Sequence, residues 1–173
     1  MRKAIIVLPR GSWIEVEPVA TVTLPYDERC RRRLRMHDDA GEPFLLDLDR
    51  PVQLADGDGL GLEGGGVIGV CAAEEAVIEA RGATVADSVR LAWHIGNRHA
   101  QVQVLADATI RLRADAVLAD MLRRSGARLF YRLAPFNPEP GAYAAEVAAP
   151  AMQPPAHIHD HDHDIDANHA ADH

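Results

Sequence analysis

TVADSVRLAWHIGNRHAQVQVLADATIRLR, residues 84–113, contains the signals of a capped helix followed by a hairpin. Thr84 offers a hydroxyl N-cap, and Asp87 stands at the third helical position, as in a capping box. Apolar residues then recur at helical spacing and predict the apolar face of this helix, formed by Val85, Val89, Ala92 and Trp93. Gly96 is the expected C′ residue in the left-handed conformation, so we predict that the helix stops before His99.

The residues on both sides of this stretch complete a pattern of four strands and two helices. Alternating apolar residues predict strands at residues 75–79, 101–105, 110–113 and 128–133. Asp107-Ala108 is the expected turn of the hairpin. A second helix is predicted from a stripe made of Val117, Leu118, Met121 and Leu122. The order β-α-β-β-α-β is that of the ferredoxin-like fold, which we assign to residues 74–147.

Residues 1–73 show short apolar stretches separated by turn formers, without a helical period of useful length. The clearest expected strands are residues 4–8, 19–24, 43–48 and 67–72. GLGLEG, residues 59–64, satisfies GxGxxG, but a strand and not a helix follows it, so we interpret it as a turn-rich β region. These features predict a small all-β domain for partner or peptide binding, and the whole chain is therefore expected to be α+β.

Four arginines alternate near the middle of this β region, at Arg29, Arg31, Arg33 and Arg35. Side chains two residues apart in a strand point to the same face, so the four would lie side by side. A solvated strand face and a partner-docking surface are both open interpretations. Nucleic acid is a poor third, because the chain as a whole is acidic.

The C-terminal residues 148–173 change in composition to Ala and Pro, and then to alternating His and Asp. With little apolar surface to bury, this tail is expected to be disordered without a ligand. Most of the nine histidines of the chain lie in it, namely His157, His159, His161, His163, His169 and His173. Neutral imidazole is a ligand suited to nickel, copper and zinc, so the tail is predicted to bind metal. The interleaved aspartates disfavour the alternative of a purification tag.

Composition limits the function classes. The net charge is −8, and the five aspartates after Pro150 leave −3 for residues 1–150, which disfavours nucleic acid as a partner. Cys30 and Cys71 form no CxxC pair, and no apolar run is long enough for a signal peptide or a membrane span. We therefore expect a cytoplasmic protein without membrane contact. The sequence contains no GxxxxGK[ST], HExxH or GxSxG motif that would indicate an enzyme.

Three histidines lie outside the tail, at positions 37, 94 and 99. His94 falls near the end of the first predicted helix, and His99 follows Gly96-Asn97-Arg98 on the turn into a strand. One histidine is not a metal site. Duplication across a two-fold axis would let two copies of His99 hold one ion jointly, and whether His94 supports His99 is open.

Several of these segments together resemble the UreE family of urease accessory nickel metallochaperones. The matching residues are LAWHIGNRH at 91–99, VLADML at 117–122, PFNPE at 135–139 and GAY at 141–143. The resemblance implies a homodimer in which nickel is held between the two copies of His99. It also implies delivery of nickel to the urease activation complex through the accessory GTPase UreG. Family members with further histidines before the second helix differ from this chain, which has none in residues 111–118.

The sequence thus favours a cytoplasmic, homodimeric nickel carrier that is not an enzyme, in which His99 forms the shared site and tail histidines assist. Zinc or copper would also bind such ligands. A passive nickel or zinc buffer is the main alternative. A metal-dependent hydrolase that uses His94 and His99 is a third possibility, with an incomplete ligand set.

Overall fold

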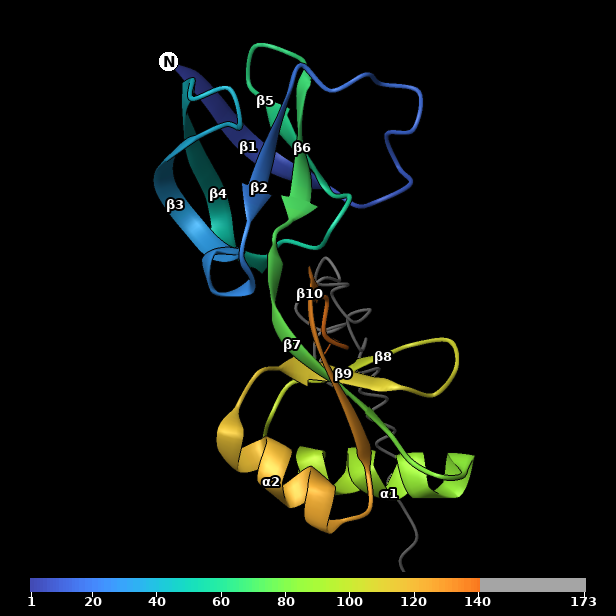
Figure 1. The fold of residues 1–173 in the computed structure, drawn as a ribbon. Coiled ribbons are helices and arrows are strands. Elements are labelled where there is room, and N and C mark those ends of the chain that lie inside the picture. Colours follow the sequence, from blue (N-terminus) through green and yellow to red (C-terminus); the bar gives the residue numbers. More distant parts are fainter. Residues whose placement is uncertain (141–173) are drawn as a thin grey trace, which may run out of the picture. The chain divides into compact units, whose positions relative to one another are not determined.

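Residues 1–140 are described by the structure, a computed structural model, and they form two β sheets and two α helices (Figure 1). The histidine-rich tail predicted for residues 148–173 lies outside the described residues. The α+β class predicted from the sequence is confirmed.

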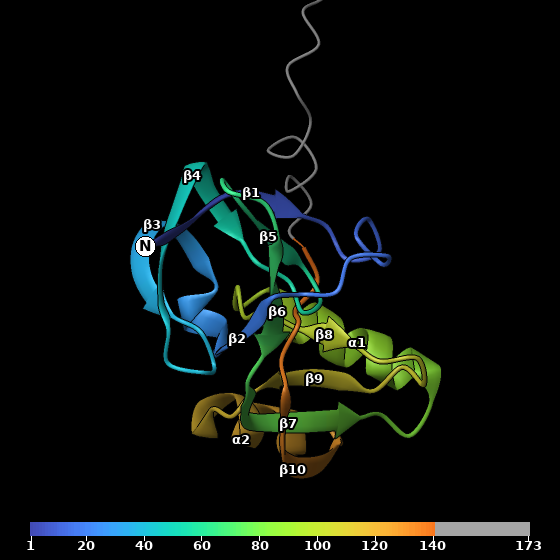
Figure 2. The ribbon, with the colours of Figure 1, turned by 90° about the horizontal axis from the view of Figure 1, so that it is seen from above.

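The first sheet has six strands, and Figure 2 shows its curl. Its strands are β1 (Arg2–Leu8), β2 (Ala20–Leu24), β3 (Cys30–His37), β4 (Pro43–Gln53), β5 (Gly59–Leu62) and β6 (Val67–Ala72). They are arranged in the order β2-β6-β5-β1-β4-β3, with β1–β4 and β2–β6 parallel and the other pairs antiparallel. A short 3-10 helix, η1 (Tyr26–Glu28), connects β2 to β3.

The four strands predicted in residues 1–73 are present, and β4 continues five residues beyond its predicted end. The interpretation of GLGLEG as β structure is also confirmed, because its first four residues form β5. A Cβ atom at Gly59 would lie 2.6 Å from Val67 Cγ1 on the neighbouring strand. Glycine at this position therefore permits close packing of two strands.

The core of this sheet consists of fully buried aliphatic and aromatic side chains, among them Ala4, Phe44, Leu46, Leu54, Leu60 and Ile68. The turn between β3 and β4 closes the curl against the outer edge of β2. Asp39 makes this contact: its carboxylate accepts from Thr23 N at 2.8 Å and from Thr21 Oγ1 at 2.6 Å, and its N–H donates to Thr21 O at 2.8 Å. The outer backbone groups of β2 are thereby occupied.

The same turn gives the first sheet a pH dependence through Asp38. The Asp38 carboxylate contacts Arg2 Nη2 at 2.8 Å and accepts from Ala40 N and Glu42 N. The bond from Arg2 holds the pKa of Asp38 below its usual range. Because the folded pKa is lowered, this stabilisation is present above about pH 4 and is lost as the pH falls through the folded pKa.

We therefore expect Asp38→Asn to lower the melting temperature at pH 7, and the difference from the unsubstituted protein to shrink at pH 3. Thermal unfolding followed by circular dichroism at both pH values measures this. Asp49→Asn is the matched control, since Asp49 is exposed and makes no side-chain bond within the described residues. A difference that stays constant with pH would contradict the prediction.

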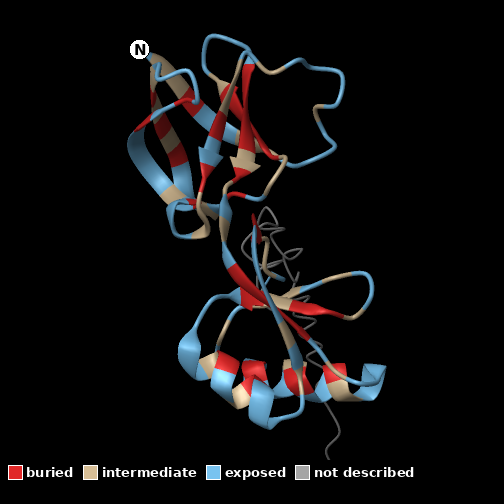
Figure 3. Cartoon of the chain, viewed as in Figure 1, coloured by how far each residue is buried: buried red, intermediate tan, exposed pale blue. Residues whose placement is uncertain are grey.

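The second sheet is antiparallel and has four strands in the order β10-β7-β9-β8. In chain order the elements are β7 (Glu74–Arg81), α1 (Val85–Gly96), β8 (Gln103–Val104), β9 (Ile110–Arg113), α2 (Ala116–Arg124) and β10 (Arg128–Pro135). Both helices cover one face of the sheet, and Figure 3 shows buried residues on their sheet-facing sides. This arrangement confirms the ferredoxin-like prediction.

The start of α1 is as predicted, but the face that it buries is not. Thr84 Oγ1 accepts from Asp87 N at 3.2 Å, and Asp87 Oδ2 accepts from Thr84 N at 3.1 Å, which completes the capping box. The helix buries Ser88, Leu91 and Ile95. The predicted face was wrong for its three large members, because Val85, Val89 and Trp93 are 70%, 63% and 64% exposed.

The helix carries two apolar stripes, and the larger aliphatic side chains Leu91 and Ile95 form the one that packs on the sheet. At 3.6 residues per turn the stripes are separated by roughly 120° around the axis. The face that α2 buries differs less from its predicted face. Leu122 is buried as predicted and Ala119 is buried too, whereas Val117 is 68% exposed.

The end of α1 also differs from the prediction. Gly96 is the last helical residue, and the left-handed residue is His99, with φ of 54°. The turn continues past Gly96 because Asn97 N donates to Trp93 O and Arg98 N donates to Ile95 O, both at 3.0 Å. The chain therefore reverses its direction at the histidine.

Three strands of this sheet differ from their predicted bounds as well. β7 covers Glu74–Arg81 and thus extends beyond the predicted residues 75–79 at both ends. β8 covers only residues 103–104 of the predicted 101–105, because Gln101 and Val102 bond to groups outside the sheet. β10 runs two residues further than predicted, to Pro135, paired with β7 along its whole length.

Candidate metal centre

His99 lies at the surface, on the turn between α1 and β8. Its backbone N–H donates to Gly96 O at 2.9 Å, and the next residue, Ala100, bonds back to Ile95 O at 3.4 Å. A positive φ at a residue with a side chain is uncommon and costs on the order of 1 kcal/mol. The surrounding fold therefore holds this histidine in a conformation that it would not adopt by itself.

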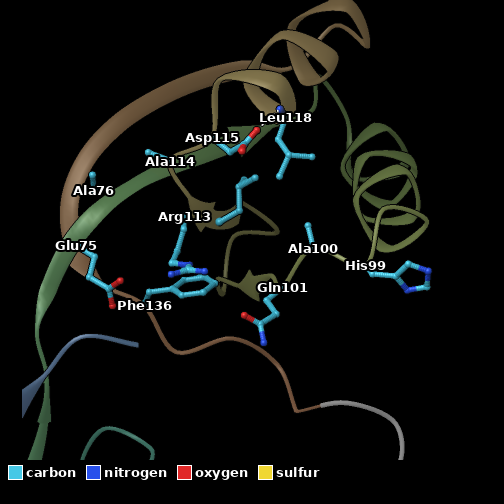
Figure 4. A pocket seen from close by; sticks show the side chains of 11 residues that line it. Glu75, Ala76, His99, Ala100, Gln101, Arg113, Ala114, Asp115, Leu118 and Phe136 are labelled. Carbon is cyan, nitrogen blue, oxygen red and sulfur yellow. Dashed lines mark hydrogen bonds between the residues drawn. The ribbon is translucent and has the colours of Figure 1, made fainter. Parts of the chain in front are cut away.

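A cavity of about 500 Å³ opens beside His99 (Figure 4). Its polar lining includes Glu75, Gln101, Arg113 and Asp115. The carboxylates have structural partners: Glu75 Oε1 accepts from Tyr26 N at 2.6 Å, and Asp115 Oδ1 accepts from Leu118 N at 2.7 Å as the N-cap of α2. Figure 4 shows the His99 imidazole at the rim, directed away from these carboxylates. The imidazole is thus presented outward and not into the cavity.

The other two histidines of the body do not join His99. His94 is exposed on α1, where its ring packs against Trp93 with ring centroids 4.9 Å apart. His37 ends β3 in the other sheet. In residues 1–140, no three His, Cys, Asp or Glu side chains are grouped so that they could hold a metal ion. The role of His99 as a metal ligand stays a prediction.

The predicted tail ligands, His157, His159, His161, His163, His169 and His173, lie outside the described residues. Of the two cysteines, Cys30 is exposed on β3, and burial raises the pKa of the Cys71 thiol. A raised pKa keeps a thiol protonated, which makes it a poor ligand and nucleophile.

The exposed stripe on α1 is the feature that the sequence interpretation missed, because it assigned these residues to the core. Val85, Val89 and Trp93 follow one another at intervals of four residues, so they form a continuous line along the helix. Gly96 continues that line and has open space above it. The stripe ends three residues before His99. Exposed apolar surface of this kind is typical of an interaction site.

The arginine-rich strand is only partly as predicted. Arg29 precedes β3, is buried and does not share a face with the others. Arg31, Arg33 and Arg35 lie on β3, the outermost strand, and Arg33 pairs with Asp47 at 3.4 Å. Their role in docking stays a prediction.

None of the helices in the described part of the chain is long and apolar enough to cross a membrane.

Comparisons with known proteins match both halves of the chain. The model of the UreE N-terminal domain matches residues 3–73, and that of the UreE C-terminal domain matches residues 75–173. A urease accessory protein UreE from Beijerinckia indica is 46% identical over 145 residues, which are 83% of this chain and 82% of that protein. One from Rhodopseudomonas palustris is 47% identical over 135 residues, 78% of this chain and 62% of that longer protein. A Bradyrhizobium protein of the same name is 44% identical over 144 residues, 83% of this chain and 68% of that protein.

By the names of the family and of its relatives, these matches define the class as accessory proteins. The chain belongs to the UreE family of urease accessory proteins. Its role lies in urease maturation.

Proposed function

We propose that the protein is a nickel-binding metallochaperone that works as a homodimer, with one ion held between the two copies of His99. The observation that carries this proposal is the exposed apolar stripe on α1, which leads to an outward-facing imidazole. Burying the stripe against its own copy would remove three large apolar side chains from water in each chain. We place the two-fold axis at the end of the stripe that leads to His99, where each imidazole would meet its symmetry mate.

A shared site explains why the described body of a single chain offers one ligand. Two imidazoles suit nickel, and also zinc and copper, but leave its coordination incomplete. In this proposal the tail histidines complete the coordination or hold additional ions. Glu139 N donates to Val102 O at 2.7 Å, so the end of the described chain is bonded to the residue three positions after His99. The first tail histidine, His157, follows after about eighteen residues, a length that spans up to roughly 60 Å when extended.

A second metal site on the body is not part of the proposal. Family members with histidines before the second helix have ligands there, whereas this chain has Arg111 and Arg113. Both arginines are committed to ion pairs, with Glu79 at 2.7 Å and with Asp27. The tail is the better candidate for holding additional ions.

The proposed recipient is the urease activation complex in the cytoplasm, reached through the accessory GTPase UreG. We also propose a separate role for each part of the chain: residues 1–73 bind a partner, residues 74–147 hold the shared ion, and residues 148–173 capture metal. Nickel or zinc buffering is the second candidate, favoured by the ligand-rich tail alone.

Nickel stoichiometry by isothermal titration calorimetry tests the proposal on the intact chain, a chain that ends at residue 150, and His99→Ala in the shorter chain. We expect the shorter chain to lose most ions but to keep about one tight ion per dimer, which His99→Ala removes. His37→Ala is the matched control, because His37 is exposed in the other sheet. A shorter chain that binds no nickel would refute the shared site.

Activation of urease in the presence of the other accessory proteins separates carrier from buffer. A carrier requires that His99→Ala in the full chain impair activation at limiting nickel. Full activation by that variant would favour buffering by the tail.

A further inference from the structure

The loop that carries His99 is held in place by the segment between β2 and β3 of the first sheet. Gln101 Nε2 donates a hydrogen bond to the hydroxyl of Tyr26, which opens η1. Tyr26 itself is fixed at two other points. Its N–H donates to Glu75 Oε1 at 2.6 Å, and its ring packs edge-on against Phe136 with centroids 5.4 Å apart.

A second connection runs from the same segment through Arg29, which is 1% exposed. Its Nη1 donates to Asn137 Oδ1 at 2.7 Å, its Nη2 donates to Phe136 O, and its guanidinium lies over the Tyr26 ring. Asn137 N in turn donates to Gln103 Oε1 at 3.0 Å. The chain after β10 is thus held between Arg29 and the residues that follow His99.

Burial of the Arg29 guanidinium makes this segment rigid. Removing a charge from water is costly, so the buried arginine keeps the geometry in which Nη1 and Nη2 are hydrogen-bonded, although Nε has no partner within the described residues. Tyr26 forms one side of the enclosure around Arg29, and its hydroxyl points out to Gln101. The phenol is therefore a fixed support for a surface loop. Backbone bonds tie residues 97–100 back to the end of α1, and the Gln101 side chain adds a bond to the segment between β2 and β3.

We infer that Tyr26 is a positioning residue for His99: its hydroxyl anchors Gln101, two residues further along, and so sets the direction in which the imidazole is presented. This inference rests on the proposed function, in which His99 is a nickel ligand. A site built from two symmetry-related imidazoles tolerates only small errors, because metal ligands act within about 0.5 Å of their working geometry. Through Tyr26 the first sheet acts on metal affinity without touching the metal.

Tyr26→Phe tests this inference, because phenylalanine keeps the ring contacts with Phe136 and Arg29 and removes only the hydroxyl. Tyr131→Phe is the matched control, because it also removes one hydrogen-bonded hydroxyl. Tyr131 lies on β10, and its hydroxyl accepts from Arg123 Nη2 on α2 at 2.6 Å. Both are made in the full-length chain with the six tail histidines replaced by alanine, so that tail sites do not mask His99. Nickel affinity is measured by competition with a chromophoric chelator.

We expect Tyr26→Phe to weaken nickel binding about two- to fivefold, the effect of losing one ordinary hydrogen bond, and Tyr131→Phe to leave it unchanged. Gln101→Ala should have the same effect as Tyr26→Phe, and the double variant should add nothing, which is the signature of two residues acting through one contact. A merely structural role would instead lower the melting temperature and give additive effects.

The outcomes separate this inference from the proposed function. If the protein without tail histidines binds no tight nickel, or if His99→Ala in that background leaves the binding intact, the proposed function fails whatever Tyr26 does. If His99 is required but Tyr26→Phe binds nickel as tightly as Tyr131→Phe, the positioning role is overturned. Additive effects of Tyr26→Phe and Gln101→Ala would also overturn it.

Discussion

Trp93→Asp should convert the protein to monomers and remove the tight nickel ion with the dimer. Trp93 is 64% exposed in the single chain, so its replacement leaves no cavity and costs the helix only a few tenths of a kcal/mol. At a two-fold interface, the same change would bring a carboxylate from each copy into an apolar contact. Burying unpaired charges costs several kcal/mol, which exceeds what a modest interface can offset.

Sedimentation velocity at micromolar concentration measures this, because the chain has a mass of 18.8 kDa and its dimer twice that. Ile14→Asp is the matched control: Ile14 is 83% exposed, lies in the other half of the chain and should leave the dimer intact. A dimer that persists in Trp93→Asp would show that α1 is not the interface.

The second large effect is expected at Glu79, for which we predict that Glu79→Gln lowers the free energy of unfolding by about 2–4 kcal/mol. Glu79 is only 9% exposed and contacts Arg111 Nη2 and Arg132 Nε, each at 2.7 Å. Without the carboxylate, the largely buried Arg111 would lose its counter-charge. We place the estimate below that for a fully buried pair because the Arg132 side chain is 55% exposed.

Urea unfolding at pH 7 measures the Glu79→Gln effect, with Glu74→Gln at the exposed start of β7 as a control that should stay within 0.5 kcal/mol or so. Burial would by itself raise the pKa of Glu79, but the bonds from Arg111 and Arg132 outweigh it and lower the pKa. The stabilisation is therefore full above about pH 4.3 and is lost as the pH falls through the folded pKa. Equal stability of the two variants at pH 7 would contradict the prediction.

Local signals in the sequence predicted local structure well. The capping box of Thr84 and Asp87 depends on residues three apart, and the hairpin turn at Asp107-Ala108 depends on neighbours, so both could be recognised without a fold. The choice between two apolar stripes on α1 could not be made in this way. It depends on which stripe meets the sheet, and Leu91 and Ile95 reach it from sequence positions far from their partners.

The candidate site shows the same contrast between local sequence signals and contacts made by distant residues. His99 was identified from its position after a helix and from the family resemblance, but its left-handed backbone follows from the turn that continues past Gly96. Arg29 looked like one member of an alternating series, yet it is buried. Its Nη1 and Nη2 donate hydrogen bonds to Asn137 and Phe136, which lie more than a hundred residues later in the sequence. No local pattern contains that information.

The bonds that join Glu139 to Val102 and Val104 hold the end of the described chain against the segment that follows His99. For a tail that captures nickel as proposed, transfer to His99 becomes an intramolecular step. Its rate then depends on an effective concentration that is set by the length of the connecting chain, and no longer on the rate at which separate molecules meet. Scarce nickel would limit the first capture, whereas loading of the shared site would be independent of the carrier's abundance wherever the dimer persists.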